Sequence, residues 1–173
     1  MKHWYMLTVV GRDRPGIVAH VTRALYEGGA NLGEASMLRL GGNFTIMLMV
    51  EFDGTARQLA VTVEPVIQSL GLHLHVDAIE GRLHEHLLPD VRITVFGADR
   101  AGIVAKVTGI LAEAGLNILD LDSDVAGSTD APLYIMHIEG QATEGVEALE
   151  SALSVVRQEG VEARLGLVET MVG

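Results

Sequence analysis

Two short turns of related sequence hold the residues of this chain that are best suited to bind a ligand. Both have the form Asp-Arg-x-Gly-Ile-Val and stand at the expected start of a helix. Free backbone N–H groups and the dipole at a helix N-terminus favour an anion, and the glycine lets a ligand approach the backbone closely. The candidate ligand-binding residues in these turns are Asp13, Arg14, Pro15, Gly16 and Ile17, and Asp99, Arg100, Gly102 and Ile103.

Two asparagines extend this candidate site. Asn31 and Asn117 open the expected second strand of each half, which we place next to the same turn, and their side chains can both donate and accept hydrogen bonds. An amino acid, with its carboxylate and amine, would suit these groups. The same residues also have ordinary structural uses, because Asp13 and Asp99 can cap the helix three residues on and Pro15 suits a first helical turn.

The two turns belong to an internal duplication. Residues 8–31 recur at 94–117 with a constant offset of 86, and fifteen of the 24 aligned positions are identical. In a chain of 173 residues this period predicts two small domains, over residues 1–82 and 88–173. The tether between them is short, so we expect the two units to pack together.

Each half predicts the order β-α-β-β-α-β. The first half has expected strands at 4–10, 31–40, 44–52 and 72–79 and helices at 16–28 and 55–69. The second has strands at 91–96, 117–125, 133–139 and 161–168 and helices at 102–114 and 144–158. Its hairpin loop, residues 127–132, is expected to be two residues longer than the first one and mobile. The fold class is therefore α+β, with two tandem ferredoxin-like units whose antiparallel sheets carry helices on one face.

The expected third strand of the first half is apolar on both faces. Its sequence over residues 45–50 is Thr-Ile-Met-Leu-Met-Val, whereas a strand covered on one face alone would alternate. Two helices can cover only one face of a four-stranded sheet. We therefore expect the other face to be buried by the sister unit or by another chain, as in a homodimer, because an exposed patch would promote aggregation.

The first turn and its surroundings resemble a known family. Gly-Arg-Asp-Arg-Pro-Gly-Ile-Val at 11–18 and Gly-Gly-Ala-Asn-Leu at 28–32 resemble an ACT domain, a small βαββαβ regulatory module. The resemblance covers almost the whole chain as two units, and the tandem arrangement is similar to the glycine cleavage system transcriptional repressor family. ACT domains bind amino acids or other small ligands near this turn, where two units meet. The resemblance therefore implies a binding role for the eleven residues named above.

The second copy departs from the family pattern at two positions of its turn. Ala98 stands where the first copy has Arg12, and Ala101 stands where it has Pro15. The second site is therefore expected to bind its ligand differently, or not at all.

Composition excludes several classes of function. The net charge is −11, from 12 basic and 23 acidic residues, with −2 over residues 1–86 and −9 over 87–173. The chain contains no basic cluster, so direct binding to nucleic acid or to an anionic membrane is disfavoured. With no cysteine, no signal peptide and no long apolar run, a cytoplasmic protein is expected.

Two clusters of possible metal ligands are discounted. The histidines of the first are His73, His75, His84 and His86, and the carboxylates of the second are Asp120, Asp122 and Asp124. A His-x-His pair can ligate zinc and three carboxylates can hold a hard cation, but polar edge strands explain both patterns better. We expect no metal and no cofactor. No catalytic motif is present either, so an enzyme is not expected.

Together these observations predict a non-catalytic, amino-acid-sensing regulatory protein. Members of the repressor family resemble regulators that carry no DNA-binding element and act through a protein partner, such as a transcription activator, and the acidic composition agrees with that. The alternative is a detached regulatory subunit of an amino-acid or one-carbon metabolic enzyme. That alternative arises because ACT units with Asp-Arg-Pro-Gly-Ile-Val also precede catalytic domains, as in formyltetrahydrofolate deformylases.

Overall fold

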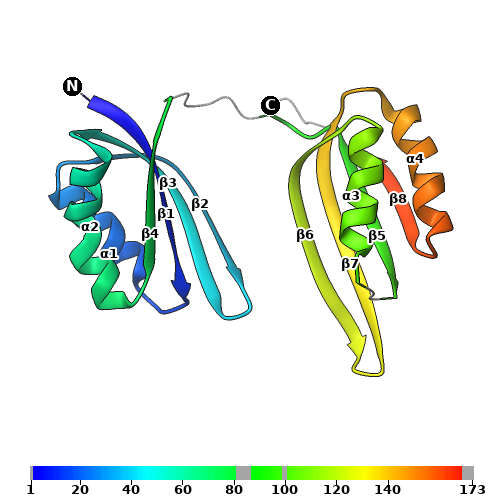
Figure 1. The fold of residues 1–173 in the computed structure, drawn as a ribbon, viewed down its shortest axis with the longest axis horizontal. Helices are drawn as coiled ribbons and strands as arrows, with labels where there is room; N and C mark the ends of the chain where they lie inside the picture. The colour runs from blue at the N-terminus through cyan, green and yellow to red at the C-terminus, as the bar shows by residue number, and fades with distance from the viewer. Residues whose placement is uncertain (1, 81–86, 99–100, 169–173) are drawn as a thin grey trace. The chain divides into compact units, whose positions relative to one another are not determined.

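A computed structural model describes residues 2–80, 87–98 and 101–168 of the chain. The chain divides into two compact units, unit 1 over residues 1–85 and unit 2 over residues 86–173. Each unit has its own sheet, its own pair of helices and its own hydrophobic core (Figure 1).

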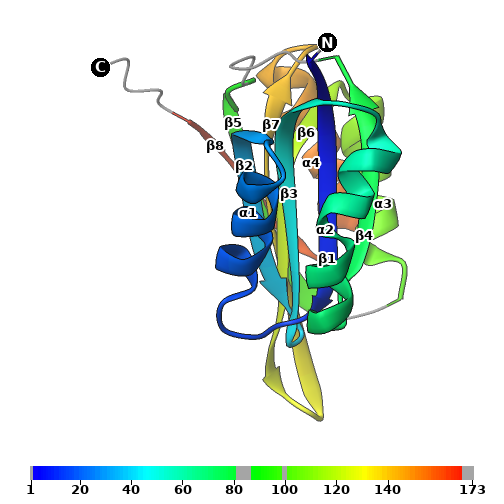
Figure 2. The ribbon, with the colours of Figure 1, turned by 90° about the vertical axis from the view of Figure 1, so that its left-hand side faces the viewer.

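Unit 1 has the predicted ferredoxin-like order. Its elements are β1 (Lys2–Arg12), α1 (Ile17–Glu27), β2 (Asn31–Leu40), β3 (Asn43–Asp53), α2 (Ala56–Leu70) and β4 (His73–Ile79). The four strands form one antiparallel sheet in the order β2-β3-β1-β4. Both helices lie on the same face of this sheet (Figure 2).

Unit 2 repeats this arrangement. Its elements are β5 (Val91–Ala98), α3 (Ile103–Glu113), β6 (Leu116–Ser128), β7 (Ala131–Ala142), α4 (Val146–Gln158) and β8 (Glu162–Leu167). The sheet order β6-β7-β5-β8 is the equivalent of the order in unit 1. The α+β fold class with two βαββαβ units is therefore confirmed.

Buried apolar side chains alternate with more exposed ones along the central strands, and the buried ones form the core of each unit. On β1, Leu7 and Val9 are fully buried beneath the helices, and Leu48 on β3 and Leu25 on α1 pack into the same cluster. Burying a leucine side chain stabilises the fold by about 1.5–3 kcal/mol. Among the described residues no polar or charged side chain is buried, so the apolar contacts dominate the stability of each unit.

Helix α2 has a capping residue pair at its start and a glycine that ends it. The Thr55 side chain accepts a hydrogen bond from the backbone of Gln58, and the Gln58 side chain accepts one from the backbone of Thr55. This reciprocal pair is a capping box. At the other end Gly71 adopts a left-handed conformation, with φ 65°, which ends the helix. Every helix among the described residues is too short or too polar to cross a membrane.

The two helices of unit 1 approach each other closely at Gly28. A Cβ atom built on Gly28 would lie 2.1 Å from the Cγ2 atom of Thr62 on α2. With Thr62 in place, a side chain at residue 28 would force the two helices or the threonine to shift, since real Cβ atoms do not approach other atoms that closely.

The second hairpin differs from its prediction. Gly127 pairs with Pro132, and Ser128 pairs with Ala131, so residues 129–130 alone form the turn. The first hairpin also has a two-residue turn, because Leu40 pairs with Asn43. The prediction of a longer loop was wrong because the extra residues extend the strands, where their backbone groups gain ladder hydrogen bonds. Accordingly β6 has 13 residues and β2 has 10.

Candidate functional site

The loop between β1 and α1 presents an uncapped helix N-terminus. Gly16 is the N-cap residue and has a left-handed backbone, with φ 86° and ψ −1°, and no side chain caps this end of the helix. The first backbone N–H groups of a helix have no partner within the helix. They are therefore available to a negatively charged or carbonyl oxygen of a ligand. Ile17, which is 2% exposed, anchors the loop in the core.

Asp13 does not cap α1, although the sequence allowed that structural use. Its carboxylate oxygen Oδ2 lies 3.1 Å from Nε of Arg39 on β2. Its backbone N–H donates to the carbonyl oxygen of Gly42, with the nitrogen 3.0 Å from the oxygen. The carboxylate points toward the hairpin instead of the helix, so Asp13 fixes the loop to the β2–β3 hairpin. Arg14 and Pro15, between Asp13 and Gly16, are exposed and accessible to a ligand.

His20 is a residue of this loop region that the sequence reasoning missed. A Cβ atom built on Gly16 would lie 3.5 Å from both Nε2 and Cδ2 of His20, so the imidazole lies beside the N-terminus of α1. Residues four apart share one face of a helix, and this spacing from Gly16 was the available signal. An imidazole can donate or accept a hydrogen bond, so His20 can contact a ligand bound to the loop.

Asn31 lies far from the loop, and its predicted place next to the turn was wrong. Asn31 pairs with Glu51 on β3, which in turn pairs with Trp4 near the start of β1, whereas the loop follows Arg12 at the other end. The eight steps along the strand from Trp4 to Arg12 span about 26 Å. The reason is that α1 runs the length of the sheet before β2 begins, so Asn31 and Gly16 cannot share one ligand within unit 1.

Asn31 has a local polar partner at its own end of the sheet. Its Nδ2 atom donates to Oε2 of Glu51 at 3.2 Å, and Lys2 Nζ lies 2.9 Å from the same oxygen. The hydrogen bonds from Lys2 and, to a smaller extent, Asn31 hold the pKa of Glu51 below its ordinary value.

Unit 2 keeps the backbone of the loop but changes its side chains. Gly102 is again a left-handed N-cap, with φ 82° and ψ 0°, and Ile103 is again buried. Lys106 occupies the position equivalent to His20, and its Nζ atom lies 2.7 Å from Oε2 of Glu159. Asn117 pairs with Gln141, at the end of the sheet opposite to Gly102. The predicted residues Asp99 and Arg100 lie outside the described residues.

The discounted clusters lie on edge strands. His73 and His75 share a face of β4, and Nε2 of His75 lies 3.0 Å from Oδ2 of Asp77. The three carboxylates of residues 120, 122 and 124 share a face of β6. Within the described part of the chain, no three potential ligand side chains are grouped as a metal site would need. His84 and His86 fall outside that part.

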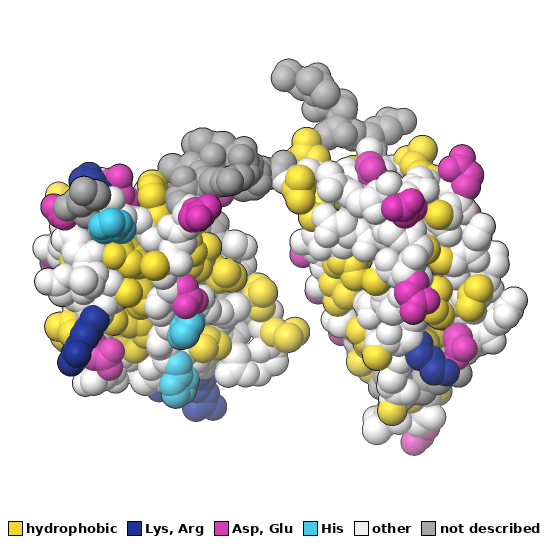
Figure 3. All heavy atoms as spheres, turned by 45° about the horizontal axis from the view of Figure 1, so that its top comes forward, with side chains coloured by type: hydrophobic (Ala, Val, Ile, Leu, Met, Phe, Trp, Pro, Cys, Tyr) yellow, Lys and Arg dark blue, Asp and Glu magenta, His cyan; other side chains and the backbone are white. Residues whose placement is uncertain are grey.

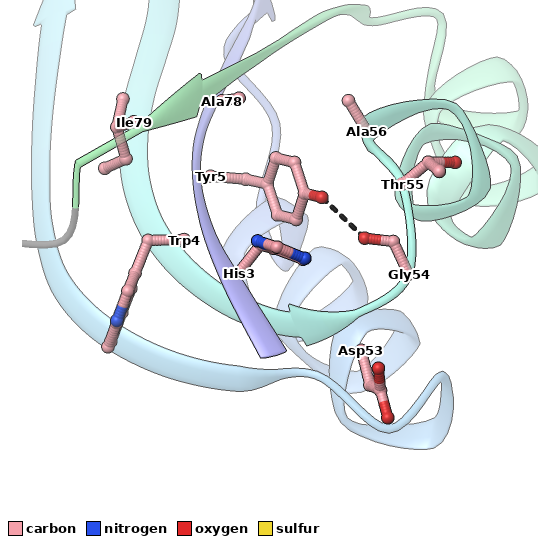
Figure 4. Close-up of a pocket in the computed structure, with 9 residues that line it drawn as sticks. All are labelled: His3, Trp4, Tyr5, Asp53, Gly54, Thr55, Ala56, Ala78 and Ile79. Atoms are coloured by element: carbon pink, nitrogen blue, oxygen red, sulfur yellow. Dashed lines mark hydrogen bonds between the residues drawn. The ribbon is translucent and has the colours of Figure 1, made fainter. Parts of the chain in front are cut away.

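A shallow pocket lies at the end of unit 1 opposite to the loop (Figure 4). Its volume is about 480 Å³, and it is lined by His3, Trp4, Tyr5, Asp53, Gly54, Thr55, Ala56, Ala78 and Ile79. The Tyr5 hydroxyl donates to the carbonyl oxygen of Gly54 at 2.5 Å, as Figure 4 shows. No residue predicted to bind a ligand lines this pocket, so it is separate from the candidate site.

Comparison with known protein families gives a match in each unit. Residues 3–77 and residues 91–157 each match a family model described as an ACT domain. The two matches fall on unit 1 and unit 2 and leave the segment between them unmatched.

Individual relatives extend the comparison to most of the chain. The glycine cleavage system transcriptional repressor of Escherichia coli is 24% identical over 139 residues, which are 80% of this chain and 73% of the relative. The protein YjhC of Lactococcus lactis is 36% identical over 83 residues, covering 46% of this chain and 95% of the relative. A crystal structure of an unknown protein from Galdieria sulphuraria is 26% identical and covers 98% of this chain and 100% of its own, with a TM-score of 0.79.

Proposed function

This chain belongs to the ACT-domain family, and from that membership we propose that it is a non-catalytic regulatory protein that senses an amino acid. The uncapped N-terminus of α1 at Gly16 is the observation that carries the proposal. Its free backbone N–H groups would hold the ligand carboxylate. His20 and Arg14 would contact the rest of the ligand, with Pro15 and Ile17 shaping and anchoring the loop and Asp13 holding it in place.

The two loops are proposed to differ in function. At the unit 2 loop, Lys106 occupies the position equivalent to His20 and is already paired with Glu159. A ligand at Gly102 and Ile103 would therefore have to displace that ion pair or bind without Lys106. We propose the unit 1 loop as the principal sensing site and assign Asp99 and Arg100 to the weaker second one.

Asn31 and Asn117 need a different role from the loop residues. Each lies at the end of its sheet opposite to its own loop, so neither can contact a ligand bound there by the same unit. They would join a binding site only through a loop that belongs to another ACT unit.

We further propose that the sensor acts on transcription through a protein partner in the cytoplasm. The similarity to the glycine cleavage repressor supports this direction, and the net charge of −11 disfavours direct contact with DNA. Ligand binding would control the partner only if the ligand binds more tightly to one of two conformations of the protein.

A thermal-shift screen of the full chain against the twenty amino acids tests the sensing role. A ligand that binds only the folded state stabilises it by about 2.7 kcal/mol at a hundred times its Kd. We expect one or a few amino acids to raise the melting temperature. No rise with any of them would overturn the assignment of an amino-acid ligand.

Two variants locate the site once the ligand is known. His20→Ala should reduce the thermal shift, whereas His137→Ala, which removes an exposed imidazole from β7 of unit 2, should leave it unchanged. Equal shifts in both variants would place the ligand elsewhere. Purification of the ligand-bound chain from its host would then show whether the protein retained with it is a transcription factor or a metabolic enzyme.

A further inference from the structure

The face of the unit 1 sheet that the helices leave uncovered is apolar. We call it the open face of unit 1. The strand registers place on it Trp4, Met6, Thr8 and Val10 of β1, Thr45, Met47 and Met49 of β3, Ser36, Leu38 and Leu40 of β2, and His73, His75, Asp77 and Ile79 of β4. Glu51 of β3 pairs with Trp4 and also lies on this face, at the end of the sheet where Lys2 forms an ion pair with it. The charged groups stand at the ends and along the β4 edge.

Several of these apolar side chains are accessible to solvent. Leu38 is 56% exposed, Leu40 71% and Met47 46%. Val10, Leu38 and Leu40 also line a recess of about 330 Å³ on this face. A contiguous apolar surface of this kind marks an interaction site in a folded protein.

The equivalent face of unit 2 is polar, although the two units share one fold. Met6 lies opposite Met49 across β1 and β3, and at the same register in unit 2 Arg92 lies opposite Glu139 and forms an ion pair with it. Figure 3 shows hydrophobic side chains on the visible surface of both units, with acidic side chains spread among them on unit 2. The apolar character of the unit 1 face is therefore not a requirement of the fold.

The neighbouring strand shows the same contrast. Ser36 and Leu38 on β2 correspond by register to Asp122 and Asp124 on β6. Burying these carboxylates against an apolar surface would remove them from water without a partner, which costs free energy. The open face of unit 2 is thus a poor match for the open face of unit 1.

We propose that two copies of this chain dimerise by packing the open faces of their unit 1 sheets against each other. An apolar face is complementary to a second copy of itself in a two-fold symmetric dimer. Residues 1–86 carry a net charge of only −2, against −9 for residues 87–173, so unit 1 opposes close approach of two copies much less.

The size of the face agrees with a specific dimer. Four strands about 4.8 Å apart and about eight residues long cover roughly 500 Å² on each copy, or roughly 1,000 Å² in total. That total reaches about the 1,000 Å² that a specific interface needs. Two sheets packed face to face would lie about 10 Å apart, with the Met and Leu side chains interdigitated between them.

Sedimentation velocity of the full chain without ligand tests the dimer. The wild type should sediment as a dimer, and Trp4, the single tryptophan, should shift its emission to longer wavelength as serial dilution releases monomers. The Met6→Arg/Met49→Glu variant copies onto unit 1 the cross-strand pair that unit 2 already accommodates. It should fold, by circular dichroism, and sediment as a monomer.

A matched variant places the same two charges on the helical side of unit 1. Tyr26 and Val61 are 80% and 66% exposed on α1 and α2, and the Tyr26→Arg/Val61→Glu variant should remain dimeric. A wild type that is monomeric at every concentration would overturn the proposal. A Met6→Arg/Met49→Glu variant that still dimerises would do the same, because it would indicate association through strand edges or helices.

Discussion

The guanidinium of Arg39 lies 3.1 Å from the carboxylate of Asp13, and this ion pair links β2 to the loop that carries Gly16. The pair is partly exposed, so its direct contribution to stability is small. Its importance lies in position, because Asp13 also donates its backbone N–H to Gly42 at the tip of the same hairpin. The hairpin therefore holds the candidate binding loop in place.

A double-mutant cycle on this pair should give a weak coupling. Asp13→Asn, Arg39→Gln and the double variant can be unfolded with urea while Trp4, which lies in unit 1, reports the transition by fluorescence. An exposed ion pair couples by about 0.2–1 kcal/mol. A coupling well above this range would mean that the loop and the hairpin form a more rigid network than the two contacts imply.

Gly16→Ala should lower the free energy of unfolding of unit 1. A left-handed backbone costs an L-residue about 1–2 kcal/mol, and this is the loss that Trp4 fluorescence should report. Space is not the cause, since an added Cβ would be 3.5 Å from its nearest neighbours. An unchanged stability would mean that the loop adopts another conformation in solution.

Gly109→Ala is the control for that substitution, and it should raise the free energy of unfolding of unit 2 instead of lowering it. Gly109 lies within α3, and a Cβ built on it meets no atom within 4 Å. Alanine in a helix interior is favoured over glycine by about 0.8–1 kcal/mol, so calorimetry should show unit 2 stabilised by that amount.

Gly28→Ala should destabilise unit 1 by about 1–3 kcal/mol through overpacking. The new Cβ would collide with Cγ2 of Thr62, 2.1 Å away. Thr62→Ser removes that methyl group and keeps the hydroxyl that donates to the Gln58 carbonyl oxygen. The double variant should therefore recover most of the stability in urea unfolding, and failure to recover it would assign the loss to the backbone of Gly28.

Glu51→Gln should change how the stability of unit 1 depends on pH. The pKa of Glu51 is lowered in the folded state, chiefly by the hydrogen bond from Lys2 and next by that from Asn31. A lowered carboxyl pKa stabilises the fold above the pKa of the unfolded chain, and this gain is lost as the pH falls through the folded value. The free energy of unfolding of unit 1 should thus be larger for the wild type than for the variant at neutral pH. This difference should disappear in acid.

Lys2→Met provides the check on that cause. It removes the principal hydrogen-bond donor to Glu51, so the loss of stability in acid should be smaller than in the wild type at the same protein concentration. An acid-induced loss as large as in the wild type would show that Lys2 does not set the pKa of Glu51.

The duplication and the apolar periodicity were sufficient to predict the fold. Buried positions such as Leu7 and Leu48 recur at the spacing of strands, and glycines such as Gly71 end helices where the pattern stops. Register could not be predicted in the same way. The extended hairpin of unit 2 depends on which residues pair across it, and several pairings keep the same alternation of faces.

The candidate site was predicted less completely than the fold. Gly16 and Ile17 lie in the expected loop. Asn31 was predicted to lie next to the same turn, but it lies at the far end of the sheet because α1 runs along the sheet before β2 begins. The sequence allowed Asp13 to cap the helix, but its side chain can reach either the helix or the hairpin. Only the path of the hairpin brings Arg39 close enough to decide between them.

Strand β2 connects two surfaces that have so far been treated separately. Arg39 points to the side of the loop, while its neighbours Leu38 and Leu40 point to the open face of unit 1. A small rotation of this one edge strand would move the anchor of the loop and the apolar surface together. If the chain senses an amino acid and dimerises as proposed, this strand would connect the ligand-binding loop to the dimer surface.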